Sequence, residues 1–224
     1  MAIALDSTAS VRGNTASANF THTVISNTNG ALVVGTSVQD SNHANFPITS
    51  ILYGASSLTK IRADEASGNN RTEIWYLLNP ATGSNSISVS ATGPIGELAV
   101  ISMALTGVQQ SGQPDAQSGN TGNSATASCS IVTVADNSWI FSMAGSEADF
   151  TGNGTSQTTI ATLVDQGFEN ARGSYEGPKT PAGSDTQSFT LGFGASWAIS
   201  SASFSPAAAA ASNNKFLPLL GVGS

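Results

Sequence analysis

The sequence reads Ala-Leu-Val-Val-Gly-Thr-Ser-Val at residues 31–38 and Asn-Ser-Ile-Ser-Val-Ser-Ala at residues 85–91. Alternation with a period of two places successive side chains on opposite faces of a β-strand, so that one face is buried and the other is exposed. The exposed positions hold small uncharged residues, and only 9% of the chain is charged, against roughly a quarter in an ordinary soluble domain. Such a face is easily desolvated because no ion loses its water when another surface covers it. The pattern therefore indicates a protein that packs against copies of itself or against a partner.

The rest of the chain continues this pattern. Turns rich in Asn, Gly and Pro, such as Asn27-Thr-Asn-Gly30 and Asn79-Pro-Ala-Thr-Gly83, separate the alternating runs. Further strands are predicted at residues 3–6, 18–25, 48–53, 58–63, 72–77, 97–106, 127–134, 139–144, 158–166, 171–175, 188–193 and 196–204. No segment has a convincing helical period. Strands at this spacing without intervening helices predict an all-β fold, a two-sheet antiparallel jelly-roll-like sandwich.

Composition divides the chain into a domain and a tail. Residues 1–206 are expected to form one β-sandwich domain, since 39% hydrophobic residues suffice for a core. Within it, the polar stretch at residues 109–124 is expected to be a long loop, either functional and draped over a neighbour or simply exposed. Residues 207–224 form an Ala-rich spacer followed by an apolar C-terminal tail.

The tail contains the candidate assembly residues. Phe216, Leu217, Leu219 and Leu220 are apolar, and Pro218 between them restricts the backbone. An uncovered apolar tail is a liability in a soluble protein, and residues 207–215 can reach about 30 Å if extended. The tail can pack back on its own sandwich or insert into a neighbouring subunit; we expect these four residues to act as anchors in a neighbour.

Charge excludes several partners. The net charge is −7, and of the seven cations only Lys60 and Arg62 lie close together. Nucleic-acid binding needs a basic patch, so we expect no direct nucleic-acid contact. No run has transmembrane length, and the first residues lack a basic region followed by a long apolar stretch. We therefore expect no membrane contact and synthesis in a host cytoplasm without a signal peptide.

The residues that could perform chemistry do not form a recognisable constellation. Cys129 is expected to be a buried structural residue, and His22, which shares strand parity with Phe20 and Val24, a hydrogen-bonded structural imidazole. Glu147-Ala-Asp149 begins like the Glu-x-Asp-x-x-Glu signature of laminarinase-like jelly rolls, but the third carboxylate is missing. Glu73 and Glu97 are expected to face outward, with Glu73 able to pair with Arg71. We expect no catalytic residues and no hydrolytic activity.

Calcium is the one metal for which the sequence offers ligands. Hard oxygen atoms occur at residues 40–45, at Asp64-Glu65 and at Glu147-Ala-Asp149. None of these segments has a dense Asp-x-Asp pattern. We expect no metal and no cofactor, although the sequence does not decide whether a calcium ion binds.

The tryptophans distinguish two functions. Carbohydrate-binding sandwiches present exposed aromatic rings on which sugars stack. Trp75, Trp139 and Trp197 each lie in a predicted strand among apolar neighbours, so we expect them in the core. An exposed row of tryptophans would favour sugar binding, and burial would favour a structural role.

Three segments resemble a group of bacterial and phage sequences. A Tyr-Gly hairpin (Tyr53-Gly54) precedes a strand at residues 73–76 and an Asn-Pro turn (Asn79-Pro80). An alternating Val/Ser strand at residues 86–90 and a Thr-Gly-Val strand end (Thr106-Gly-Val108) follow. Over roughly residues 1–206 the chain resembles concanavalin-like jelly rolls of virion and surface proteins. The resemblance implies the fold and, less directly, a virion location, and it implies no catalytic residues.

These observations lead to one expected function and one alternative. We expect a non-enzymatic virion structural protein, specifically a phage capsid decoration or cement protein that binds itself, with trimers favoured, and a major capsid protein. The alternative is a carbohydrate-binding or adhesion module on a cell or virion surface, of the tail-fibre type.

Overall fold

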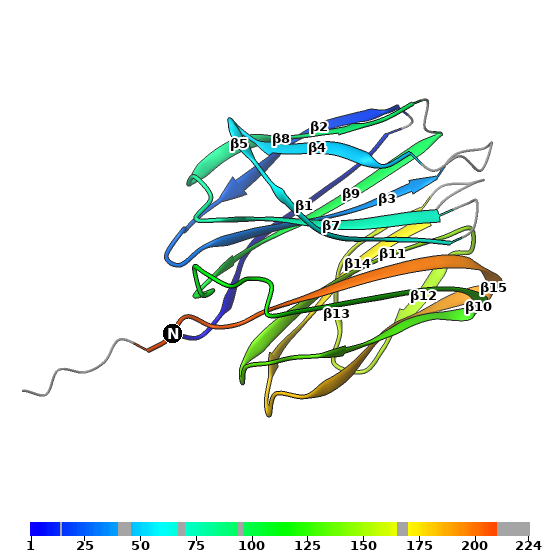
Figure 1. Cartoon of the computed structure of the whole chain (residues 1–224). Helices are drawn as coiled ribbons and strands as arrows, with labels where there is room; N and C mark the ends of the chain where they lie inside the picture. Colours follow the sequence, from blue (N-terminus) through cyan, green and yellow to red (C-terminus); the bar gives the residue numbers. More distant parts are fainter. Residues whose placement is uncertain (14, 40–45, 67–69, 94–95, 165–169, 210–224) are drawn as a thin grey trace, which may run out of the picture.

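The computed structural model describes residues 1–224 except 14, 40–45, 67–69, 94–95, 165–169 and 210–224 (Figure 1). The described residues contain fifteen strands and no helix. The strands are β1 (Ala4–Gly13), β2 (Ser17–Val24), β3 (Ala31–Gln39), β4 (Ile48–Tyr53), β5 (Ser56–Ser57), β6 (Thr59–Glu65), β7 (Asn70–Leu78), β8 (Gly83–Ala91), β9 (Glu97–Thr106), β10 (Ala116–Val132), β11 (Ser138–Ser146), β12 (Phe150–Asn153), β13 (Thr158–Leu163), β14 (Asn170–Lys179) and β15 (Ser184–Phe204).

Hydrogen bonding divides the strands into three antiparallel sheets. An upper sheet has the order β2-β8-β4-β5, a central sheet the order β1-β9-β3-β7-β6, and a lower sheet the order β10-β15-β11-β14-β13, with β12 also paired to β15 (Figure 1). The predicted all-β antiparallel sandwich is confirmed, and its topology is consistent with a jelly roll. The sheet count differs from the prediction, because a third sheet is added to the expected two.

The central sheet is covered on both faces. Leu32 and Val34 of β3 point into the apolar core beneath the upper sheet, whereas Val33 of the same strand points into the core above the lower sheet. Every residue of β3 is therefore buried. Residues 31–38 were expected to have one exposed face, and this was wrong because a sheet packs against each side. In β8 the expectation is confirmed, since Ile87 and Val89 are buried while Ser90 is exposed.

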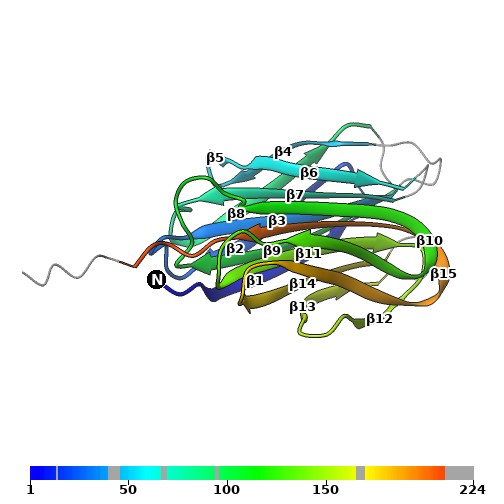
Figure 2. The same ribbon diagram turned by 60° about the horizontal axis from the view of Figure 1, so that its bottom comes forward.

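The lower sheet folds over on itself. Strands β10 and β15 pair along their length, and the pairing shifts register between Ser124 and Thr126. Beyond that bend, residues 126–132 of β10 and 184–191 of β15, together with β12, form an arm that lies over the outer side of the lower sheet (Figure 2). A third apolar core lies under the arm, where Phe189 packs with Ala144 and Ile199.

Several strands are longer than the sequence predicted, and β10 and β15 differ most. β10 begins at Ala116, so that much of the stretch expected to be a loop (residues 109–124) is a strand. β15 joins the two strands predicted at residues 188–193 and 196–204. In both cases a partner strand stabilises Gly- and Ser-rich backbone whose own sequence has weak strand preference.

The chain contains a structural duplication. The order β1-β9-β3-β7-β6 of the central sheet is repeated by β10-β15-β11-β14-β13 in the lower sheet. The upper-sheet strands β2, β8 and β4 likewise correspond to the arm segment of β10, the arm segment of β15 and β12. The two units meet at the central and lower sheets, with β3 on β11, β6 on β10 and β13 on β1. Such reciprocal contacts define an approximate twofold relation between the units.

Polar contacts repeat with the strands. Asp6 accepts hydrogen bonds from the backbone N–H groups of Ile25 and Ser26, and Asp115 accepts them from Val134 and Ala135. The turns that precede β3 and β11 each contain an asparagine with positive φ, Asn29 (49°) and Asn137 (63°). In both units, therefore, an aspartate that accepts two backbone hydrogen bonds and an asparagine with positive φ stabilise the corresponding turn.

Candidate interaction surfaces

The carboxylates considered for catalysis lie at the surface, two residues apart in the chain. Glu147 and Asp149 are exposed after β11, with buried Ala148 between them. Within the described part of the chain, no three His, Cys, Asp or Glu side chains form a group that could hold a metal ion. A glycosidase would need two carboxylates placed on either side of one bond.

The calcium candidates have other contacts. Asp64 pairs with Arg62 and accepts a hydrogen bond from Ser200 Oγ at 2.6 Å, and Glu65 pairs with Arg71 at 2.8 Å. Residues 40–45 lie outside the described residues. Asp64 and Glu65 are therefore used in ion pairs and do not form an open oxygen cage.

All three tryptophans are buried, as predicted, with exposed fractions of 7% for Trp75, 9% for Trp139 and 4% for Trp197. Trp139 stacks on Tyr175 with ring centroids 5.3 Å apart, and Trp197 donates its indole N–H to Ser124 Oγ at 3.0 Å. No row of exposed tryptophans is present in the described structure. The feature that would have favoured sugar stacking is thus not found there.

His22 is a buried structural imidazole, as predicted. Its exposed fraction is 1%, and its ring nitrogens hydrogen-bond Ser7 Oγ at 2.9 Å and Ser102 Oγ at 2.8 Å. Cys129, also predicted to be buried, occupies the equivalent place in the second unit and lies 3.2 Å from Ser201 Oγ. Burial lowers the pKa of His22 to about 4, although Asp6 acts in the opposite direction. Burial raises the pKa of the Cys129 thiol, which makes it a poor nucleophile.

The low pKa of His22 predicts acid sensitivity. The unfolded chain takes up a proton at this residue near pH 6.5, whereas the folded chain does so only near pH 4. The contribution of neutral His22 to the free energy of unfolding is therefore fully present above pH 6.5. It is lost as the pH falls toward 4, and the loss is about 3 kcal/mol at most. We expect the free energy of unfolding of the wild type to fall more steeply over this interval than that of His22→Gln, as measured by urea denaturation. Parallel pH profiles would contradict this.

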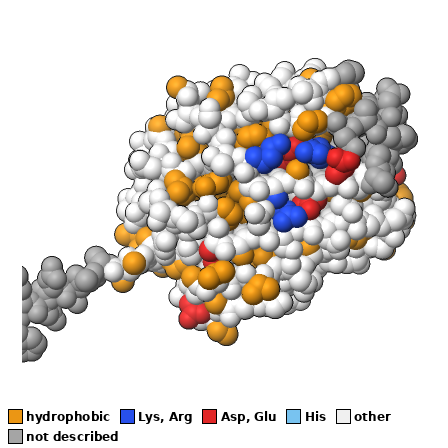
Figure 3. All heavy atoms as spheres, in the orientation of Figure 1, with side chains coloured by type: hydrophobic (Ala, Val, Ile, Leu, Met, Phe, Trp, Pro, Cys, Tyr) orange, Lys and Arg blue, Asp and Glu red, His pale blue; other side chains and the backbone are white. Residues whose placement is uncertain are grey.

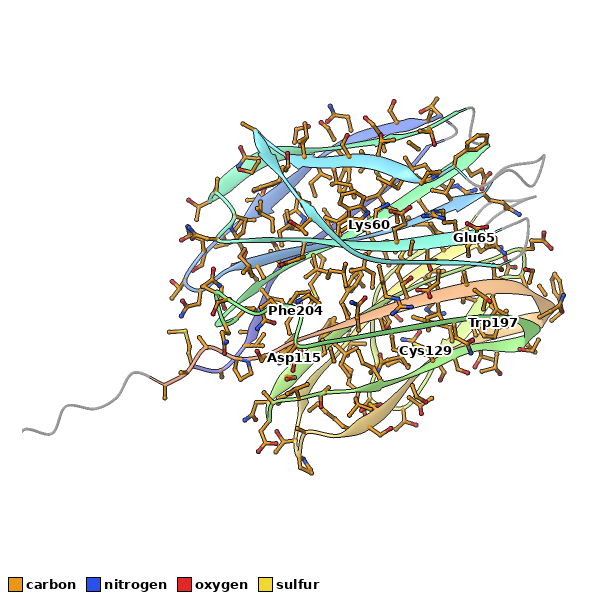
Figure 4. All side chains as sticks on the ribbon, viewed as in Figure 1. Lys60, Glu65, Asp115, Cys129, Trp197 and Phe204 are labelled. Carbon is orange, nitrogen blue, oxygen red and sulfur yellow. The ribbon has the colours of Figure 1, made fainter. Side chains whose placement is uncertain are left out.

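Six charged side chains gather at one edge of the central sheet. They come from β6 and β7, and Figure 3 shows their blue and red atoms together on a face that is otherwise mostly uncharged. The cluster comprises Lys60, Arg62, Asp64, Glu65, Arg71 and Glu73. Figure 4 shows Lys60 and Glu65 along this edge. Charges on an edge strand discourage pairing with another chain.

Glu73 is the centre of this cluster. Its side chain is fully buried and accepts from Arg71 Nε at 2.7 Å, Lys60 Nζ at 2.8 Å and Trp75 Nε1 at 3.0 Å. A fourth donor, the Ile48 N–H at 3.1 Å, belongs to β4 and so ties the upper sheet to the central sheet. The predicted pairing with Arg71 is confirmed. The outward orientation was wrong, because Glu73 shares its face with Trp75, which the upper sheet covers. Glu97 is likewise buried and pairs with Arg12.

The outer face of the upper sheet is uncharged; we call it the upper face. Strands β2, β8, β4 and β5 contain no Asp, Glu, Lys or Arg, and all their residues are described. Alternate residues of β2 and β8 form its centre: Ser17, Asn19, Thr21 and Thr23 beside Ser90, Ser88, Ser86 and Ser84. Neighbouring hydroxyl groups bond to each other, as Thr23 and Ser84 do at 2.7 Å.

The outer face of the arm has the same character; we call it the arm face. Its exposed and half-buried residues are Thr126, Ser128, Ser130 and Val132 beside Thr190, Ser188, Thr186 and Ser184. The one charged residue in these segments, Asp185, shares parity with buried Gln187 and Phe189 and pairs with Lys179. The two faces lie at opposite ends of the stack of sheets (Figure 1). A neighbour can cover either face without removing water from an ion.

The predicted anchors Phe216, Leu217, Leu219 and Leu220 lie outside the described residues. The root of the tail is described: Ala207 N–H donates to Gly107 O at 2.8 Å, and the amino group of Met1 donates to Ala207 O. A shallow hollow of about 460 Å³ lies there, lined by Met1, Ala2, Asn137 and residues 206–209. Residues 207–209 therefore lie at the same end of the molecule as the N-terminus (Figure 1).

Comparisons with known proteins identify no family for this chain. No protein-family model matches the chain, and no curated protein matches it. The resemblance to phage and bacterial jelly rolls stays a prediction. Among the described residues, no helix is long and apolar enough to cross a membrane.

Proposed function

We propose that this chain is a non-enzymatic structural protein of a virion, specifically a decoration or cement protein of a phage capsid that associates with copies of itself and with a major capsid protein. The observation that carries the proposal is the pair of uncharged strand faces at the two ends of the stack. Such faces bind a flat neighbour at low desolvation cost. Stabilising a particle requires this kind of broad, repeated contact.

The arrangement of polar groups supports a structural role over catalysis. Buried Glu73 is satisfied by four donors, and Glu97 is paired with Arg12, so neither resembles a poised acid or base. His22 and Cys129 are enclosed and bonded to serines. A catalytic group needs access to substrate and a matched partner.

Burial of the tryptophans makes the adhesion alternative less favoured. An adhesion module of the sugar-stacking kind would use exposed aromatic rings. Phe193, with an exposed fraction of 61%, is the one aromatic side chain among the large exposed hydrophobic residues of the described structure. A single ring does not form a platform for a sugar chain.

Immuno-electron microscopy tests the location. Antibodies against the purified chain are expected to label the outer surface of native phage heads at regular positions. Label on the tail tip or on the cell envelope would overturn the decoration role and favour adhesion. A panel of polysaccharides in a binding assay provides the second readout, and we expect no binding.

The C-terminal tail is expected to affect particle binding separately from the stability of the β domain. Deleting residues 210–224 is expected to leave a folded β domain, because side chains of the described residues up to Phe204 form three apolar cores. If Phe216, Leu217, Leu219 and Leu220 are anchors, binding to particles should be lost, since each buried side chain contributes about 1.5–3 kcal/mol. Denaturation and particle co-sedimentation measure the two effects. An unfolded truncated protein would assign the tail to its own core, and normal particle binding would refute the anchors.

A further inference from the structure

The duplication makes the upper face and the arm face equivalent. The pair Thr23–Ser84 on the upper face corresponds to Ser130–Thr186 on the arm face, and each pair lies directly across two antiparallel strands. The match extends to the interior, where His22 and Cys129 lie beneath the two faces and contact Ser102 and Ser201. A surface that binds a partner at one end therefore has a counterpart at the other end.

By strand register, each face also carries an exposed apolar residue two positions beyond Thr23 or its counterpart Ser130. Ile25 follows β2 and has an exposed fraction of 71%, and Val132 ends the arm segment of β10 and has an exposed fraction of 61%. A single exposed aliphatic side chain is ordinary, but two at matching places in both units are better evidence for a contact surface. They give each uncharged face one apolar contact point.

The charge distribution selects the occupant. The chain carries a net charge of −7, so copies repel one another wherever their charged surfaces meet. The charged cluster at β6 and β7 lies on the side of the stack, and the upper and arm faces carry none of it. Two copies that meet face to face keep their charges apart and exposed to water. A strongly charged partner would gain nothing from these faces.

We propose that the upper face and the arm face are two equivalent binding surfaces for second copies of this chain, so that each copy joins two neighbours. The inference rests on the self-association that the proposed function requires, and it adds the valency and the surfaces. Like faces pair across a local twofold axis, upper to upper and arm to arm. Because the faces lie at opposite ends of the stack, pairing continues into an open row instead of closing as a trimer.

Lysine substitutions on one face at a time test the valency. The variant Thr21→Lys/Ser90→Lys places two charges on the upper face, and Ser130→Lys/Thr190→Lys places two on the arm face; all four residues are exposed. Burying an unpaired ammonium group is unfavourable enough to block pairing. By sedimentation velocity, the wild type is expected to give a sedimentation coefficient that rises with concentration. Each one-face variant should stop at the dimer, and the four-lysine variant should stay monomeric.

A matched control separates face contacts from a general charge effect. Gln117 and Asn123 are exposed on the edge strand β10 outside both faces, so Gln117→Lys/Asn123→Lys should assemble as the wild type does. A wild type that stays monomeric, a one-face variant that is monomeric, or a one-face variant that still forms rows overturns the proposal. Row formation without label on phage heads would refute the virion role and leave this inference standing. Labelled heads, together with rows that persist in a one-face variant, would support the virion role and overturn this inference.

Discussion

Replacing Glu73 by glutamine is expected to lower the free energy of unfolding by about 3–5 kcal/mol. The carboxylate is fully buried between Arg71 and Lys60 and also accepts from Trp75 and from the backbone of β4. Removing the negative charge leaves two cations facing each other over a neutral amide. The upper sheet also loses a strong contact with the central sheet, since the Ile48 N–H keeps at best a neutral acceptor.

Glu65→Gln is the matched control for this prediction. Glu65 belongs to the same cluster and contacts the same Arg71 at 2.8 Å, but its side chain is 34% exposed. An exposed ion pair contributes about 0–1 kcal/mol, so the variant should be nearly as stable as the wild type. Urea denaturation measures both. Equal losses for the two variants would show that burial of Glu73 does not determine its contribution.

Replacing Gly35 by methionine is expected to cost about 3 kcal/mol of unfolding free energy. Gly35 lies in β3 at the contact between the two units, and a Cβ added there would come within 2.8 Å of Phe141 and 2.9 Å of Met143 Cβ. By the strand correspondence, Met143 of β11 occupies the place that Gly35 has in β3. The absence of a side chain in one unit therefore accommodates the large side chain of the other.

A swap of the two residues tests this explanation. The double variant Gly35→Met/Met143→Gly should be more stable than Gly35→Met alone, because the added volume is removed across the interface. Gly13→Met is the control, since a Cβ at Gly13 meets no atom within 4 Å. No recovery of unfolding free energy in the double variant would contradict the proposed packing of β3 on β11.

Much of the fold could be predicted from the alternating pattern. The turn residues and the periodicity at residues 85–91 identified strands whose inward residues, such as Ile87 and Val89, are buried. Burial of His22 followed from its strand parity with Phe20 and Val24, and burial of Trp75 from its apolar neighbours within a predicted strand. Periodicity reports only on one strand at a time, however, and the complete burial of β3 depends on a second covering sheet.

The duplication left signals that alternation alone does not reveal. The sequence Pro80-Ala-Thr-Gly-Ser84 at the start of β8 resembles Pro181-Ala-Gly-Ser184 at the start of β15, and Asn29-Gly30 resembles Asn137-Ser138. A search for internal repeats would have aligned these turns. The inward position of Glu73 could have been predicted from its strand parity with Trp75, but its donors could not, since they come from β4, β6 and β7, which the sequence does not bring together.

Cryo-electron microscopy of the assembled wild-type protein tests the central claim most directly. Neighbouring copies are expected to meet through alternate residues of β2 and β8 at one end and through residues 126–132 and 184–191 at the other. The charged edge formed by β6 and β7 should stay exposed to solvent. Copies that meet through this edge, or through their tails with both uncharged faces bare, would contradict the account.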